Sequence, residues 1–436
     1  MRGPPFRRVM RSVLRNLARA AGAALPRRTR HRVYRNMISC DDHPGPELVL
    51  KLAESREELE ACFSLLHDAY VEAGFMQPVA SGMRVTLYHA LPTTSTLMAT
   101  YGGRVVGTLS LIRDSGIGFP MQKIFDLDVI RCRGGNMAEV SALAVHRRYR
   151  STGGRILFPM MKFMYEYATR CFDTRHLLIA VNPRHIAMYE SLLFFRRLQH
   201  KPVEHYGFVN GAPAVGAHLD LKRALPLLRS HYDGKPPDKN LYRYFTQVEL
   251  PNIVLPKRRY FTTNDPVMTP ELLDYFFNFR TDVFRNLDQR TRVQLHAIYD
   301  LPSYQRVLPW IPPELAAGNR MMRRHERFSV LCPARILVEA GQRKRLLPVK
   351  VIECSQSGLR ARSRQPLPEG VEGRVFVELG HEDRACLDVA MLRRSHNDPR
   401  TSVFKVKEAD PVWLKFVNAL QNAVVHHDLE EATRFM

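Results

Sequence analysis

The stretch that decides the fold is Ala138-Glu139-Val140-Ser141-Ala142-Leu143-Ala144-Val145-His146-Arg147-Arg148-Tyr149-Arg150-Ser151-Thr152-Gly153-Gly154-Arg155. Residues 139–145 are mostly apolar and predict a strand, and residues 152–171 predict a long helix. A basic turn with two glycines joins them. A strand, a glycine-containing turn and a helix start direct backbone N–H groups at one point, which is the usual geometry of a phosphate site.

A second motif follows the next predicted strand, at residues 176–181. It reads Asn182-Pro183-Arg184-His185-Ile186-Ala187-Met188-Tyr189-Glu190-Ser191-Leu192-Leu193-Phe194. Asn182 is placed to cap a predicted helix over residues 185–195. Tyr189 lies on that helix, where a role in packing and a role in chemistry are both open.

These two motifs resemble motifs A and B of the GNAT N-acyltransferases. Arg150, Gly153 and Gly154 match the turn of motif A, whereas Arg155 stands where glycine or alanine is usual. The resemblance is closer to the bacterial N-acyl amino acid synthases, which are GNAT-fold relatives of acyl-homoserine-lactone synthases, and it covers residues 47–222. The segments that carry it are Phe63-Ser64-Leu65-Leu66-His67-Asp68-Ala69-Tyr70, Thr108-Leu109-Ser110-Leu111-Ile112-Arg113-Asp114 and Glu139-Val140-Ser141.

The resemblance implies that a long fatty acyl chain moves from acyl-carrier protein, or from acyl-CoA, to the α-amine of an amino acid. It implies that the acyl-donor phosphopantetheine binds at Val145, Arg150, Gly153, Gly154 and Asn182. The arginines of the turn suit an acidic carrier protein, so we expect the carrier rather than acyl-CoA as donor.

The chemistry itself suggests the catalytic residues. An amine must lose a proton to attack a thioester, and Glu139 is the carboxylate on the strand that would face it. A purely structural role for Glu139 is the alternative. Ser141 lies two residues further on the same strand face and would orient the thioester or the amine. Tyr189 would protonate the departing thiolate.

A third motif lies near the C-terminus. Arg323-Arg324-His325-Glu326-Arg327 is followed 26 residues later by Glu353-Cys354-Ser355-Gln356-Ser357-Gly358, among six short β-type segments that predict a small barrel. This region resembles the PilZ domain, which binds cyclic di-GMP. The resemblance implies that the dinucleotide binds at Arg323, Arg324, Arg327, Glu353, Ser355 and Gly358, although Glu353 stands where Asp or Asn is usual.

The predicted fold class is therefore α+β and multidomain. We expect a basic amphipathic segment at 1–44, a GNAT-like mixed α/β acyltransferase domain at 45–224, a mainly helical bridge at 225–318, a PilZ-type β-barrel at 319–424 and a tail at 425–436. The bridge either links the domains or packs on one of them.

Charge narrows the choice of partners. The chain has 436 residues and a formal net charge of +22, and its first 40 residues carry eleven arginines and no acidic residue. This excess indicates polyanionic partners, and no nucleic-acid-binding motif accompanies it, so we do not expect nucleic acid. The basic leader suits an anionic membrane surface. We therefore expect a cytoplasmic protein, whose leader is either a solvated basic segment or a helix that lies peripherally on the inner face of the membrane.

The remaining features exclude other classes. The seven cysteines form no CxxC pair, so the sequence predicts no metal site and no disulfide framework. The leading hypothesis is an N-acyltransferase that cyclic di-GMP regulates. The alternative is a non-catalytic, cyclic di-GMP-responsive adaptor at the membrane surface with a degenerate GNAT domain.

Overall fold

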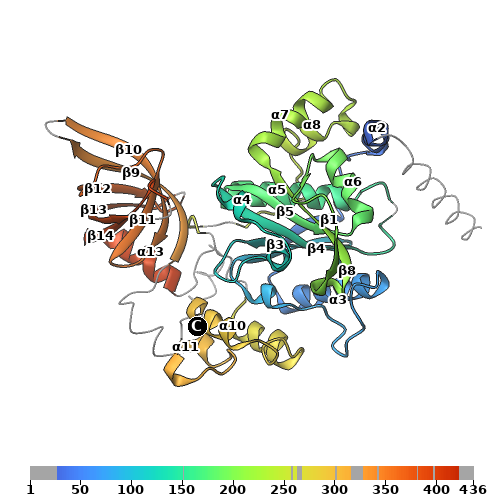
Figure 1. The fold of residues 1–436 in the computed structure, drawn as a ribbon, viewed down its shortest axis with the longest axis horizontal. Helices are drawn as coiled ribbons and strands as arrows, with labels where there is room; N and C mark the ends of the chain where they lie inside the picture. Colours follow the sequence, from blue (N-terminus) through green and yellow to red (C-terminus); the bar gives the residue numbers. More distant parts are fainter. Residues whose placement is uncertain are drawn as a thin grey trace, which may run out of the picture.

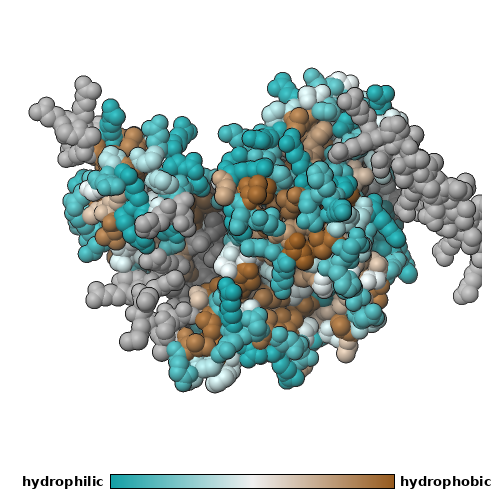
Figure 2. Space-filling view, in the orientation of Figure 1, coloured by the Kyte–Doolittle hydropathy of each residue, from teal (hydrophilic) through white to brown (hydrophobic). Residues whose placement is uncertain are grey.

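The computed structural model describes residues 27–150, 152–256, 259–262, 268–299, 302–315, 328–340, 343–380, 382–395 and 398–421. Figure 1 shows a mixed α/β body, a β-barrel beside it, and a small helical region below both. Polar residues cover most of the face drawn in Figure 2, and apolar side chains gather over the helical region and over the middle of the α/β body.

An eight-stranded sheet forms the α/β body. Its order is β1-β2-β3-β4-β5-β8-β6, with β7 paired to β8, and β4 and β5 are its parallel neighbours. The strands are β1 (Leu48–Leu52), β2 (Thr94–Tyr101), β3 (Arg104–Arg113), β4 (Asn136–Val145), β5 (Thr174–Val181), β6 (Arg196–Arg197), β7 (Val203–Tyr206) and β8 (Ala212–Asp220). Gly102 and Gly103, both with positive φ, form the turn of the β2–β3 hairpin.

Both faces of the sheet are covered, because successive side chains of each strand point to opposite faces. Leu177 and Ile179 of β5 pack in one apolar cluster and Leu178 in the other. The first cluster includes helices α5 (Leu157–Phe172), α6 (Pro183–Leu192), α7 (Leu221–Tyr232) and α8 (Leu241–Thr246). The second includes α3 (Arg56–Glu72) and residues from 268 to 308.

Helix α3 begins with a capping box. Ser55 is its N-cap, the backbone N–H of Glu58 donates to the Ser55 hydroxyl, and the Glu58 carboxylate accepts from the Ser55 backbone N–H. This reciprocal capping box satisfies two N–H groups that the helix leaves unpaired.

Strand β4 contains a β-bulge that opens the sheet. Thr108 lies opposite Ala144 and Ser110 opposite Ser141, so β4 has one extra residue between these pairs. Ala142 lies within the bulge with a left-handed φ of 52°. The extra residue reverses the alternation of side chains along the rest of the strand.

The segment expected as a bridge packs on the α/β body. It contains α7 after its first turn, α8, α9 (Pro270–Leu273), η5 (Asp274–Phe279), α10 (Gln289–Ile298) and α11 (Pro302–Gln305). Helix α9 continues directly into η5, which is a π-helix. Its wider turn places two adjacent rings, Phe276 and Phe277, in the interior together, with neither exposed.

A closed barrel forms the C-terminal region, in the order β10-β11-β14-β13-β12-β9. Its strands are β9 (Phe328–Ala340), β10 (Arg343–Cys354), β11 (Gly358–Ser363), β12 (Glu372–Glu378), β13 (Arg384–Arg394) and β14 (Thr401–Ala409). Helix α13 (Pro411–Gln421) covers it with the buried rings of Trp413 and Phe416. The predicted small barrel is present.

The basic N-terminal segment is described only from residue 27. Helix α2 (Arg27–Met37) packs against α6, and Ile38 and Cys40 after it are buried in the first apolar cluster. Residues 1–26 of the predicted basic amphipathic segment lie outside the described residues.

Candidate active site

A cavity of about 420 Å³ lies where β4 and β5 separate. Their parallel pairing ends at Glu139 opposite Leu178. After this pair the two strands no longer contact each other as a ladder, and the cavity is lined by residues 140–145 from β4 and by residues 179–182 from β5 and its end. The bulge at Ala142 accounts for this separation, because it turns β4 away from a regular ladder. The lining draws on both faces of the sheet: Tyr70 comes from α3 and Tyr189 from α6.

Glu139 is the buried carboxyl group on the cavity wall, with 2% of its surface exposed. The backbone N–H of Met121 donates to its Oε2 over 3.1 Å. Burial raises the pKa of Glu139 to about 8, and the Met121 hydrogen bond opposes that shift in part. A carboxyl group that titrates near neutral pH can accept and release a proton during turnover.

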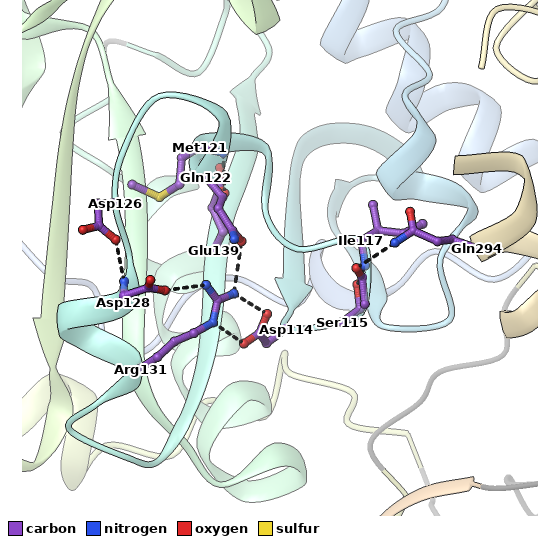
Figure 3. A network of polar contacts seen from close by, with 11 residues as sticks. Asp114, Ser115, Ile117, Met121, Gln122, Asp126, Asp128, Arg131, Glu139 and Gln294 are labelled. Carbon is purple, nitrogen blue, oxygen red and sulfur yellow. Dashed lines mark hydrogen bonds and ion pairs between the residues drawn. The ribbon is translucent and has the colours of Figure 1, made fainter. Parts of the chain in front are cut away.

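The segment that carries Met121 is held by a network of charged side chains (Figure 3). Met121 lies in η2 (Pro120–Lys123), next to Gln122. Arg131 donates to both carboxylate oxygens of Asp114, over 3.3 and 2.9 Å, and to Gln122 Oε1 over 3.1 Å. The network therefore fixes η2, and with it the donor to Glu139.

Three buried tyrosines lie within the electrostatic influence of Glu139. Burial raises the pKa values of Tyr70, Tyr88 and Tyr206, and the charge of Glu139 adds to each shift. Among the described residues, the buried Tyr206 hydroxyl has no hydrogen-bond partner. Because Tyr206 lines the cavity, this hydroxyl is placed to bind a substrate group.

Arg84 is a site residue that the sequence did not indicate. Only 9% of its surface is exposed, and its guanidinium lies 4.3 Å from the Tyr70 ring centroid and 5.0 Å from that of Phe208. It donates to the Phe208 backbone oxygen over 2.7 Å, and within the described part of the chain no carboxylate forms an ion pair with it. Arg84 does not itself line the cavity, but it contacts Tyr70 and Phe208, which do. A buried cation without a counter-ion is costly.

The predicted catalytic residues come together. Ser141 and Tyr189 line the same cavity as Glu139. Burial raises the pKa of Tyr189 to about 12, and nearby Tyr70 contributes, so Tyr189 stays a neutral hydrogen-bond donor. Its ring packs edge-on against Phe195 at 5.8 Å, so Tyr189 also has a packing role.

The predicted donor-binding residues separate into two groups. Val145, Arg150 and Asn182 line the cavity, whereas the lining does not include Gly153 and Gly154. Both glycines have positive φ, 70° and 93°, in the turn before α5. Helix α5 begins at Leu157 instead of the predicted residue 152, because this turn occupies the intervening residues.

Two of these residues have structural partners. Arg150 donates to the Val145 backbone oxygen and to Glu72, each over 2.7 Å. Asn182 caps α6 as predicted, since its side chain accepts from the Arg184 backbone N–H over 3.1 Å.

The barrel residues proposed for the dinucleotide are described only in part. Arg323, Arg324 and Arg327 lie outside the described residues. Glu353 lies at the end of β10 and pairs with Arg360 over 3.2 Å. In the turn that follows, the backbone N–H and the hydroxyl of Ser355 both donate to the Gly358 backbone oxygen.

The described residues lack two other kinds of feature. They contain no cluster of three or more His, Cys, Asp or Glu side chains that would hold a metal ion. They also contain no helix with the length and apolar character to cross a bilayer.

The sheet order, the bulge and the opening between two parallel strands define the α/β body as a GNAT-type acyltransferase domain. Residues 61–220 match the family model described as N-acyl amino acid synthase FeeM. This part of the chain is therefore a FeeM-like N-acyltransferase domain. No curated protein matches the chain.

Several solved structures are similar to this domain. The N-acyl amino acid synthase FeeM from uncultured soil microbes is 24% identical, with a TM-score of 0.37, over 43% of this chain and all of that one. The CoA-dependent acyl-homoserine lactone synthase BjaI is 22% identical, with a TM-score of 0.33, over 42% of this chain and 89% of that one. The synthase LasI is 16% identical, with a TM-score of 0.33, over 41% and 91%.

Proposed function

We propose that the acyltransferase domain moves a long-chain fatty acyl group from a phosphopantetheine thioester to the α-amine of an amino acid. The observation that carries this proposal is the buried Glu139 carboxyl group on the wall of a cavity that opens between β4 and β5. The match of residues 61–220 to the FeeM family supports the same chemistry.

The reaction follows from the groups on the cavity wall. Ionised Glu139 takes a proton from the ammonium group of the acceptor, and the free amine attacks the thioester carbonyl. The tetrahedral intermediate releases the second proton of its cationic nitrogen to solvent and collapses to the amide and a thiolate, which takes a proton from the neutral Tyr189 hydroxyl. Ser141 orients the reacting groups, and the proton left on Glu139 returns through solvent to Tyr189.

The acceptor is a molecule with a carboxylate near its amine. Arg84 supplies a buried cation without a counter-ion among the described residues, and Tyr206 supplies a free buried hydroxyl. Arg84 and Glu139 share neighbours, because both influence the pKa values of Tyr70 and Tyr206. An amino acid would present its amine to Glu139 and its carboxylate to Arg84.

The acyl donor enters from the side of the basic turn. Val145, Arg150, Gly153, Gly154 and Asn182 are the residues that we propose for its phosphopantetheine. Arg147, Arg148, Arg150 and Arg155 are exposed around this turn and suit the acidic surface of an acyl-carrier protein.

Two measurements test the proposed activity. Expression in a bacterial host, followed by lipid extraction and mass spectrometry, should reveal acylated amino acids that a host with the Glu139→Gln variant lacks. Failure to find such a product would favour the alternative of a non-catalytic adaptor. Turnover with matched acyl-carrier protein and acyl-CoA then identifies the donor, and faster turnover with acyl-CoA would contradict the carrier assignment.

We further propose that the barrel binds cyclic di-GMP and regulates the transferase. The observation that favours this is the closed barrel with the tight Ser355–Gly358 turn between two of its strands. Arg323, Arg324 and Arg327 would grip the phosphates, while Glu353, Ser355 and Gly358 would approach a guanine base. Lys350 of the barrel donates to Asp173, the residue after α5, over 2.6 Å. Through this contact, binding of the dinucleotide to the barrel would influence the transferase.

Titration with cyclic di-GMP tests this second proposal. The native protein should bind at micromolar concentration, and Arg327→Ala should not. Arg335→Ala, at an exposed position of β9 away from these motifs, is the control and should bind like the native protein. Equal binding by both variants would contradict the assignment. We propose a cytoplasmic location at the inner membrane surface on the charge of the leader alone.

A further inference from the structure

A second cavity, of about 450 Å³, lies between α2 and the end of α7. Five basic side chains line it: His31, Arg32, Arg35, His231 and Lys235. None of them lines the cavity beside Glu139. Within the described part of the chain, the lining contains no carboxylate.

The fold holds several of these groups in place. The Arg35 Nε donates to the Ser191 backbone oxygen over 2.8 Å, and its guanidinium lies 5.0 Å from the Phe194 ring centroid. The same ring packs against His231 at 4.7 Å. Arg35 and His231, from helices far apart in the sequence, therefore meet on one aromatic ring.

Two lysines after α7 also contact α2. Lys235 Nζ donates to the Asn36 side-chain oxygen over 3.3 Å, and Lys239 Nζ donates to the Asn36 backbone oxygen over 3.0 Å. Arg32 is exposed, and among the described residues it makes no hydrogen bond or ion pair. The cavity thus contains cations that the fold holds in place and one, Arg32, that has no partner among the described residues.

Several other arginines in this domain have a carboxylate partner. Arg150, Arg175 and Arg197 each pair with a carboxylate, namely Glu72, Asp220 and Glu190. Cations that converge without a carboxylate between them repel one another, and this repulsion costs stability. An anion bound in the cavity would remove that cost.

We propose that this cavity is a binding site for a phosphate group. Guanidinium and ammonium groups are the side chains that bind phosphate oxygens through charge-assisted hydrogen bonds. The group is carried either by a small phosphorylated molecule or by the headgroup of an anionic lipid. The leader favours the lipid, since residues 1–26 contain six arginines and no acidic residue.

The test uses full-length native protein, a cavity variant and a charge-matched control. The cavity variant is Arg32→Gln with Lys235→Gln, and Arg32→Gln alone is added because it leaves every described contact in place. The control is Arg335→Gln with Arg384→Gln, two exposed positions of the barrel at the far end of the molecule (Figure 1). Thermal melting checks that each variant is folded.

Two probes separate the sources of phosphate. Calorimetric titration uses glycerol 3-phosphate, and sedimentation uses vesicles of phosphatidylglycerol mixed with phosphatidylcholine. We expect the cavity variant to bind at least one probe about tenfold or more weakly than the native protein and the control. Loss with glycerol 3-phosphate identifies a small-molecule site, and loss with vesicles alone identifies a headgroup site.

Equal affinity of the cavity variant and the control for both probes would overturn the proposal, because the cavity charges would then make no specific contribution. The readout is binding rather than acyl transfer, so it is independent of the proposed enzymatic function.

Discussion

Glu139 combines a burial that costs stability with a position that suits proton transfer. Burial raises its pKa to about 8 from its ordinary 4.5. The folded protein therefore keeps a proton that the unfolded chain releases as the pH rises above 4.5. This group accordingly makes folding less favourable as the pH rises from about 4.5 to 8, at about 1.4 kcal/mol per pH unit.

Glu139→Gln should separate activity from stability. We expect kcat to fall about 10²- to 10⁴-fold, because the variant lacks the base. The same variant should melt at a higher temperature than the native protein at pH 8, and the difference should shrink towards pH 5. Thermal melting across this range, with turnover at each pH, makes the measurement. A variant that loses both stability and activity at pH 8 would indicate a structural role.

Arg84→Gln should weaken binding of the acceptor and leave the acyl donor unaffected. A charge-assisted contact with a carboxylate is worth about 1.5–3 kcal/mol, so KM for the amino acid should rise about 10- to 100-fold. The native enzyme should prefer an amino acid to its carboxamide, and the variant should lose this preference. A preserved preference would show that Arg84 does not bind the carboxylate.

The sequence predicts part of this constellation. The two motifs contain Glu139, Ser141 and Tyr189. The first two lie on one strand and Tyr189 on the helix after the next strand, so the order of the motifs predicts that the three residues come together. Arg84 comes from a loop outside these motifs, and its burial between Tyr70 and Phe208 depends on segments 124 residues apart. No local sequence pattern predicts a contact between residues so far apart in the chain.

At the scale of elements, the turn before α5 offers a matched comparison. A Cβ on Gly154 would lie 2.5 Å from the Phe158 ring, whereas one on Gly153 would meet nothing within 4 Å. Both glycines have positive φ, so each change to alanine carries about 1–2 kcal/mol of backbone strain.

We expect Gly154→Ala to lower the free energy of unfolding by about 1–3 kcal/mol more than Gly153→Ala does, because only Gly154 adds the steric clash. Urea unfolding of the two variants measures this difference. Equal losses would mean that the Phe158 ring moves aside freely.

The strands and helices follow from the sequence more closely than their irregularities do. The barrel strands match alternating apolar patterns because each buries one face, and the central transferase strands match continuous apolar runs because both faces of their sheet are covered. The bulge at Ala142 has no such signal, since residues 142–145 form an uninterrupted apolar run. The π-helix at residues 274–279 has no sequence signal either, because four aromatic residues in six positions also suit an ordinary helix.

At the scale of the whole molecule, the helical region after α8 is part of the transferase core. Phe276 is fully buried and packs edge-on against Phe63 of α3 at 5.2 Å. The Tyr299 hydroxyl donates to the Ala90 backbone oxygen, which fastens α10 to the same body.

Phe276→Ala should therefore destabilise the transferase itself. We expect a loss of about 3–5 kcal/mol, typical of a buried phenylalanine. The loss should appear in the unfolding transition that also inactivates the enzyme, as judged by circular dichroism and residual turnover. A separate, earlier transition that spares activity would mean that residues 268–308 unfold independently.

The bulge in β4 also bears on how such an enzyme tolerates insertions and deletions. Removal of Ala142 alone would restore equal numbers of residues between the paired positions of β3 and β4. The strand would then run straight, and its last residues would continue their pairing with β5. We therefore expect this one-residue deletion to preserve the fold and to close the cavity between β4 and β5. A single codon would then separate a continuous sheet from one that admits a substrate.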